Sequence, residues 1–149
     1  MIDDPTRDRL HALVRRESRS LLQYVREVPL WVAGPDREAL DKLRARAGAE
    51  LKAVDALGKH LLARKAALSH LGPFPSEFSS FNDMALKHLL PILVREQRRA
   101  LADLEADLPH VADADAAAVV RELLEFKRRD LADLESLTAQ PHVITKAPA

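Results

Sequence analysis

The stretch RELLEFKRRDLADLESL, residues 121–137, decides the fold because it combines a helical apolar stripe with acidic side chains. At 3.6 residues per turn, one face of this helix carries Val119, Leu123, Phe126, Leu134 and Leu137. Asp130 falls in the middle of that face, and Asp133 follows one turn later. A helix buries such a face, and a buried carboxylate is costly unless it is paired or bound to a metal. The stretch therefore predicts a helix that carries acidic groups into a protein core.

The composition of the chain limits the classes of protein to which it can belong. A length of 149 residues corresponds to about one domain. Twenty-three basic and 23 acidic residues balance, so no long-range attraction to nucleic acid or to an anionic membrane is expected. Cysteine is absent, which excludes disulfides and thiolate metal sites. The polar N-terminus MIDDPTRDRL argues against a secretory signal, and no apolar run approaches the roughly 18 residues of a membrane span. We expect a cytoplasmic protein without nucleic-acid or membrane partners.

The same helical period recurs three more times, and strand alternation is nowhere sustained. The expected helices cover about 4–27, 36–71, 83–108 and 113–138. Asp4 and Pro5 are typical of a helix start. A tryptophan, Trp31, is expected to plug the first turn, and the three Phe of segment 71–83 to fix that connection to the bundle.

Each of the first three helices also carries a polar residue at the centre of its apolar stripe. These residues are Glu17, Glu50 and Gln97, and Arg46 lies one turn from Glu50 on the same side. By contrast, the basic runs, Lys127–Arg129 among them, are interleaved with acids and are expected to form solvated faces. No histidine pair has the spacing of metal ligands. The central polar positions are therefore the candidate site.

A shift of 80 residues aligns the two halves of the chain without a gap. Leucines meet leucines along both helices of each half, and Pro29 meets Pro109 at the turn. The central polar positions correspond as well, since Glu17 aligns with Gln97 and Glu50 with Asp130. Amphipathic periodicity alone would not place turn prolines and buried polar groups in one register. We interpret the chain as a duplicated helical hairpin, with repeat halves at about 5–57 and 85–137.

A duplicated hairpin with this arrangement of carboxylates resembles the ferritin-like superfamily, and rubrerythrin-type domains in particular. The resemblance implies that the first and third helices each give a Glu to a di-iron site, and that the second and fourth each give Glu-x-x-His. The corresponding positions here are Glu17, then Glu50 and Ala53, then Gln97, and finally Asp130 and Asp133.

The resemblance also implies the architecture. We expect an all-α, up-down-down-up four-helix bundle over residues 1–138, with a long crossover between its second and third helices and a flexible tail over 139–149. Eleven extended linker residues could span about 36 Å. That length matches a helix of about 24 residues.

The departures from the ligand pattern indicate a vestigial cluster from which metal is absent. Neither histidine of the pattern is present, and Gln97 replaces a carboxylate. We expect the candidate residues Glu17, Glu50, Gln97, Asp130 and Asp133 to meet in the interior. There, Arg46 would bridge to Glu17 or Glu50, Gln97 would donate its amide to another member, and some carboxylates would share a proton. Two other interpretations stay open, a carboxylate-only site for Fe or Mn and a cluster unrelated to any metal site.

The function that these observations predict is a non-catalytic structural or protein-interaction module without a cofactor, whose protein partner is unknown. Analogy with some members of the superfamily suggests a role in stress. The alternative is a carboxylate-rich di-metal protein that acts as an oxidase, peroxide scavenger or metal store. A homodimer is also expected, because an apolar surface extends beyond the repeat. That surface comprises Leu57, Leu61, Leu62, Ala66, Leu68 and Leu71.

Overall fold

The computed structural model of the chain describes residues 2–28, 30, 32 and 34–139. These residues form helices and connections without a strand, which confirms the all-α prediction for this part of the chain. The α-helices are α1 (Asp4–Ser18), α2 (Leu21–Glu27), α3 (Arg37–Ala63), α4 (Leu86–Asp107) and α5 (Ala114–Thr138). Short 3₁₀ turns cover Gly34–Asp36, Ser76–Phe81 and Leu108–His110. None of the described helices is long and apolar enough to cross a membrane.

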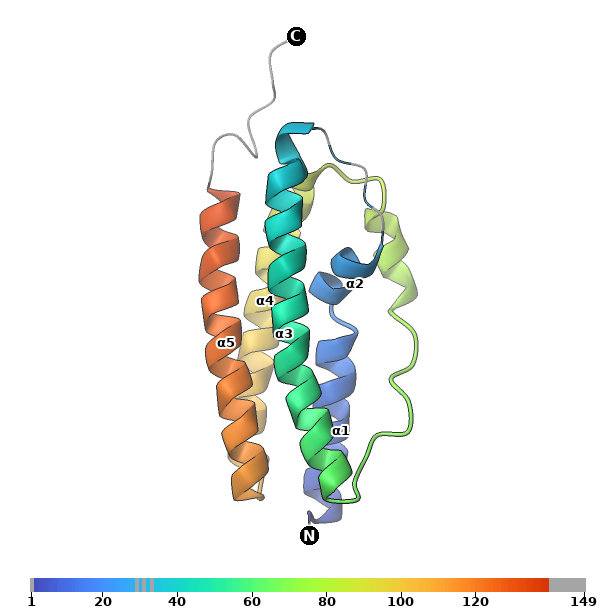
Figure 1. Cartoon of the computed structure of the whole chain (residues 1–149), viewed down its shortest axis with the longest axis vertical. Helices are drawn as coiled ribbons and strands as arrows, with labels where there is room; N and C mark the ends of the chain where they lie inside the picture. Colours follow the sequence, from blue (N-terminus) through green and yellow to red (C-terminus); the bar gives the residue numbers. More distant parts are fainter. Residues whose placement is uncertain (1, 29, 31, 33, 140–149) are drawn as a thin grey trace.

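The long helices lie roughly parallel to one axis (Figure 1). α1 and α2 run upward from the N-terminus, and α3 returns downward. The chain then climbs along the outside of the bundle, and α4 runs downward, so that α3 and α4 share a direction. α5 runs upward again and packs against both α3 and α4. α1 packs mainly against α3, whereas its contact with α4 is sparse.

The starts of α1 and α5 follow from their capping residues. Asp3, one residue before the predicted start, accepts a hydrogen bond from the Thr6 amide at 2.8 Å, and Pro5 occupies the first turn. Asp113 caps α5 in the same way, through the Ala116 amide at 2.8 Å. Such caps satisfy backbone N–H groups that have no partner within the helix. The predicted span 113–138 for the last helix thus agrees closely with the structure.

The single helix predicted over residues 4–27 is wrong, because the chain breaks between Ser18 and Leu21. Ser20 has an extended backbone, and its hydroxyl accepts from the Gln23 amide at 3.3 Å, so it begins a new helix. The buried side chain of Gln23 then donates to the Ala47 carbonyl of α3 at 2.7 Å. A serine in this position competes with helix continuation by capping. The apolar period continues across the break, which is why the sequence alone suggested one helix.

The predicted helix over 36–71 is also too long, since α3 ends at Ala63. Lys65 adopts a left-handed backbone conformation with φ of 58°, and the Ala66 amide returns to the Leu61 carbonyl at 2.8 Å. This arrangement is a common way to close a helix. The following crossover is fixed by its aromatic side chains, as predicted. Phe74, Phe78 and Phe81 pack against the core, with Phe74 and Phe78 beside the Tyr24 ring.

Two apolar clusters fill the bundle, one above the other. The upper cluster contains buried side chains from segments 21–30, 39–47, 86–94 and 134–137. The lower cluster contains those from segments 2–14, 54–66, 104–111 and 116–124. In each of the four long helical segments (α1 with α2, α3, α4 and α5), a short interval of sequence belongs to neither cluster. Those intervals hold the central polar residues, so a polar layer divides the core.

Two predictions concern residues outside the described part of the chain. The plug expected at Trp31 is one of them. The flexible tail expected over 139–149 is the other, except for Ala139, which caps the end of α5.

Candidate functional site

A polar layer lies inside the bundle between the two apolar clusters. Its members are Glu17 on α1, Glu50 on α3, Gln97 on α4, and Lys127 and Asp130 on α5. None of them is more than 2% exposed. Four of the five predicted site residues are therefore in this layer, together with a lysine that the sequence analysis placed elsewhere.

Lys127 occupies the centre of the layer and is completely buried. Its Nζ atom lies 2.6 Å from Glu17 Oε1, 2.8 Å from Glu50 Oε1 and 3.4 Å from Gln97 Oε1. Burial lowers the pKa of this ammonium group, but attraction to Glu17 and Glu50 outweighs that effect and raises the pKa above its usual value. Lys127 is consequently protonated at neutral pH. A protonated, paired amine that solvent cannot reach is not a nucleophile.

Glu50 receives a second donor within the layer. Gln97 Nε2 donates to Glu50 Oε2 at 2.7 Å, as the sequence analysis predicted for this amide. Burial raises the pKa of Glu50, but the attraction of Lys127 and hydrogen bonds from Asp130, Lys127 and Gln97 bring it below its usual value. Glu50 is therefore a charged carboxylate with donors on both oxygens.

The second oxygen of Glu17 connects the layer to the surface. Arg16 Nε donates to Glu17 Oε2 at 3.2 Å, and the same guanidinium reaches Asp107 Oδ2 at 2.9 Å. Arg16 is about one-third exposed, so its charge is partly solvated. Glu17 thus has one buried and one half-buried cationic neighbour.

Asp130 behaves differently from Glu50. Burial raises its pKa to about 8, helped by a hydrogen bond with Glu50 and by repulsion from that carboxylate, whereas Arg46 and Lys127 oppose the shift. As a carboxylate, Asp130 would leave both oxygens without a hydrogen-bond donor. Protonated, it has an O–H group that can donate to Glu50. Asp130 and Glu50 are thus the pair for which a shared proton is predicted.

The predicted role of Arg46 is wrong. Its Nη2 atom lies 2.7 Å from Asp130 Oδ1 and 2.8 Å from Asp133 Oδ2, so it pairs with the Asp133 carboxylate and lies beside the Asp130 carboxyl group on α5, rather than with Glu17 or Glu50. The reason is that Lys127 already fills the space between those two glutamates. Arg46 instead lies at the edge of the bundle, 38% exposed, with its guanidinium over the Phe126 ring.

Asp133 is not in the interior, contrary to the sequence expectation. Its side chain is 58% exposed and contacts the outer side of Arg46. Lys127 and Asp133 lie three residues before and after Asp130, so the helix places them on opposite flanks of it. The Lys127 flank faces the glutamates of α1 and α3, and the Asp133 flank faces solvent. Asp133 therefore lies at the rim of the polar layer.

The residues of the layer do not fit a di-metal centre. In the described part of the chain, no group of three or more His, Asp or Glu is placed so that it could hold a metal ion. The position between Glu17 and Glu50, where the resemblance implies metal, is taken by the Lys127 ammonium. A fixed positive charge 2.6–2.8 Å from both carboxylates repels a divalent cation and competes for the same oxygens.

The prediction that Lys127 belongs to a solvated face is wrong, although the sequence contained a signal for its burial. Lys127 follows Leu123 by four residues and precedes Asp130 by three, which are helical spacings on one face. The predicted apolar stripe includes the neighbouring Phe126 instead, and Phe126 is only half-buried. The repeat gave no indication of a polar residue at position 127 either, because the corresponding residue 80 positions earlier is Ala47.

Fold and site together define a class of protein: a helical bundle with a buried lysine–carboxylate layer across its core. No family model, curated protein or solved structure matches the chain. Function is therefore inferred from the geometry of this layer and its surroundings.

Proposed function

We propose that the protein is a ferritin-like four-helix bundle that has exchanged di-metal chemistry for a structural ion-pair layer, and that it acts as a non-catalytic structural or protein-interaction module in the cytoplasm. The observation that carries the proposal is the position of Lys127 Nζ, 2.6 Å from Glu17 Oε1 and 2.8 Å from Glu50 Oε1. An internal ammonium supplies the positive charge that metal ions supply in the resembled family. It does so without an open coordination position for oxygen or peroxide.

The two apolar clusters support the ferritin-like part of the proposal. Residues that are 80 positions apart lie in opposite clusters: Leu10 is in the lower cluster and Leu90 in the upper one. Leu43 and Leu123 show the reverse exchange. A two-fold relationship between two hairpins produces such an exchange, because it turns one half of the bundle upside down relative to the other. The shared direction of α3 and α4 fits the same up-down-down-up arrangement (Figure 1).

Metal-dependent melting tests the non-catalytic part of the proposal. The wild-type protein, purified without chelators, should contain no stoichiometric metal by elemental analysis. Its melting temperature should not rise when Mn²⁺ or Fe²⁺ is added, because a ligand that binds the folded state would raise it. The variant Lys127→Met leaves Glu17 and Glu50 without their shared cation and should gain a metal-dependent rise.

The exposed lysine Lys59 on α3 provides the matched control. Lys59→Met should behave as the wild type in every metal condition. A metal-dependent rise in the wild-type protein, or stoichiometric Fe or Mn in it, would favour the alternative of a di-metal protein and end the proposal.

The homodimer has limited support. Three members of the surface expected to mediate it, Leu57, Leu61 and Ala66, are buried in the lower cluster of the same chain. Leu62 is 65% exposed and is the feature that still favours pairing. Light scattering at high micromolar concentration should give the mass of a dimer for the wild type and of a monomer for Leu62→Glu. A monomeric wild type would remove the dimer from the proposed function.

A further inference from the structure

A pocket of about 550 Å³ opens between α1, the start of α2, the crossover and α4. Small side chains, Ala12 and Ala100, line it where larger ones would close the space between α1 and α4. Its volume lies within the range of about 300–1,000 Å³ that is usual for small-molecule sites. The polar layer lies at its base, because Glu17 and Gln97 contribute to the lining.

The crossover forms a fixed wall of this pocket. Gly72 has a φ of 77°, a conformation that favours glycine, and it turns the chain there. Arg19 holds the turn, since its Nε atom donates to the Gly72 carbonyl at 2.8 Å and its guanidinium lies 4.9 Å from the centre of the Phe74 ring. The wall therefore presents Pro73 and Phe78 to the pocket in a defined position. A wall of this kind limits the entropy that a ligand must remove on binding.

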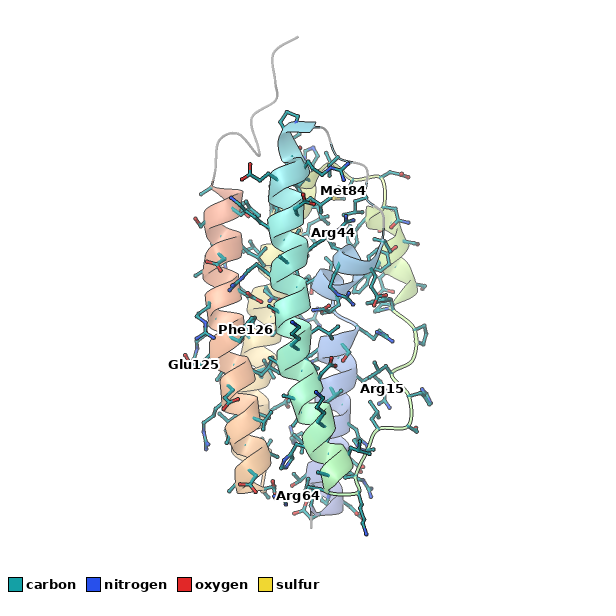
Figure 2. The ribbon with its side chains drawn as sticks, viewed as in Figure 1. Arg15, Arg44, Arg64, Met84, Glu125 and Phe126 are labelled. Atoms are coloured by element: carbon teal, nitrogen blue, oxygen red, sulfur yellow. The ribbon has the colours of Figure 1, made fainter. Side chains whose placement is uncertain are left out.

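The lining combines an apolar interior with positive charge. Its apolar side chains include Leu21, Leu93 and Phe78. Two arginines of the lining, Arg15 and Arg99, have no ion pair among the described residues. Figure 2 shows Arg15 on the side of α1 that faces the crossover.

The other charged side chains of the lining leave a positive surplus. Arg16 is already paired with Glu17 and Asp107. Arg19 bonds to carbonyl groups only, so its positive charge is not cancelled by a carboxylate. Together with Arg15 and Arg99, it faces two acids, Glu96 and Asp103. The pocket is therefore suited to a ligand with an apolar body and one negative charge.

We propose that this pocket binds a medium-chain carboxylate, with its hydrocarbon chain between α1, α4 and Phe78 and its head group at Arg15 and Arg99. Guanidinium groups match the planar, two-oxygen geometry of a carboxylate. The chain would cover apolar surface that is otherwise in contact with water. This inference goes beyond the proposed function, because it concerns a pocket beside the polar layer and requires neither a metal nor a protein partner.

Calorimetric titration of the full-length protein with decanoate, below its micelle concentration, tests the inference. Saturable binding of one decanoate per chain is expected. Decyltrimethylammonium, with the same chain and the opposite charge, should bind far more weakly. Arg15→Gln and Arg99→Gln should each weaken decanoate binding roughly tenfold, as loss of one charged hydrogen bond implies. Arg37→Gln, on an exposed position of α3 outside the pocket, should leave it unchanged.

Variants that fill the pocket with a larger side chain distinguish specific decanoate binding from nonspecific adsorption. Ala100→Phe should abolish decanoate binding, whereas Ala102→Phe, exposed on the same helix and outside the pocket, should not affect it. Ala12→Phe provides a second filling variant at an exposed position, in case Ala100→Phe does not fold. The inference is overturned if decanoate fails to saturate, if the cationic probe binds equally well, or if a folded pocket-filling variant binds as the wild type does.

Discussion

The ammonium nitrogen of Lys127 lies 2.6 Å from the carboxylate of Glu17 in a part of the bundle that solvent does not reach. An ammonium group has three N–H donors, and three acceptors surround this one, at Glu17, Glu50 and Gln97. Its Nζ atom donates hydrogen bonds to Glu50 Oε1 and Gln97 Oε1, and the Glu17 carboxylate adds a second negative charge in direct contact. A buried charge is tolerated when countercharges and hydrogen bonds surround it in this way.

Replacement of Lys127 by methionine should strongly destabilise the fold. Methionine keeps much of the side-chain volume but leaves Glu17 and Glu50 buried without their common cation. Loss of one partner from a buried ion pair costs about 3–5 kcal/mol. Urea unfolding followed by circular dichroism should show this loss as a lower midpoint with an unchanged slope.

Removal of all three charges, those of Lys127, Glu17 and Glu50, should reduce the stability less than removal of the Lys127 charge alone. In a variant that adds Glu17→Gln and Glu50→Gln to Lys127→Met, no unpaired charge is left inside the bundle, so part of the stability should return. Equal unfolding midpoints for Lys127→Met and the wild type would show that Lys127 is not part of a buried ion-pair network.

Arg46→Ala should have a smaller effect, of about 1 kcal/mol, because Arg46 is 38% exposed and water can replace part of its interactions. A position of Arg46 between buried glutamates, as expected from the sequence, would instead imply a loss of several kcal/mol. Unfolding by urea distinguishes the two values, with exposed Arg37→Ala as the control. A loss as large as that of Lys127→Met would place Arg46 inside the layer after all.

The sequence predicted the helical class and most of the polar layer because both depend on periodicity. Glu17, Glu50, Gln97 and Asp130 each interrupt an apolar stripe, and burial of four stripes in one bundle brings their centres together. Lys127 was missed for a different reason. A lysine within the run KRR resembles a surface residue, and only its tertiary partners on α1 and α3 reveal why it is buried.

The ends of the helices were predicted less well, because periodicity does not determine where a helix stops. Ser20 interrupts the first stripe without changing its register, and Lys65 ends α3 by a backbone conformation that a lysine adopts only occasionally. Both features depend on local hydrogen bonds. The apolar pattern on either side does not indicate where these hydrogen bonds form.

Ser20→Ala tests the origin of the break between α1 and α2. Its hydroxyl caps α2 through the Gln23 amide, and loss of an N-cap costs about 1 kcal/mol. Thermal or urea unfolding should therefore show a modest loss, whereas Ser20→Asp, which can also cap, should retain most of the stability. If Ser20→Ala is as stable as the wild type, packing rather than capping maintains the break.

The raised pKa of Asp130 predicts how stability depends on pH. In the unfolded chain this carboxyl loses its proton near its ordinary value of 3.8, whereas in the folded protein it keeps the proton up to about pH 8. Between these two values the folded state binds more protons than the unfolded state. The free energy of unfolding contributed by Asp130 is therefore fully present below about pH 4 and is lost as the pH rises toward 8.

Glu50 contributes in the opposite direction, but in another pH range. Its pKa is lowered from 4.5, so its contribution is present above that value and is lost only in more acidic solution. Urea titrations between pH 5.5 and 9 thus report mainly on Asp130 among the acids of the layer. Within that range, the wild-type protein should be most stable at the acidic end.

Asp130→Asn separates this effect from the titration of histidines elsewhere in the chain. The asparagine amide can donate to Glu50 as the protonated carboxyl does, but it has no proton to lose. The difference in unfolding free energy between the wild type and Asp130→Asn should grow with pH in favour of the variant up to about pH 8, since histidine effects are common to both proteins. Asp133→Asn, which removes the exposed carboxylate beside Arg46, is the control. A pH-independent difference would mean that Asp130 is ionised throughout, and that its buried carboxylate is stabilised by Arg46 and Lys127 instead of by a proton shared with Glu50.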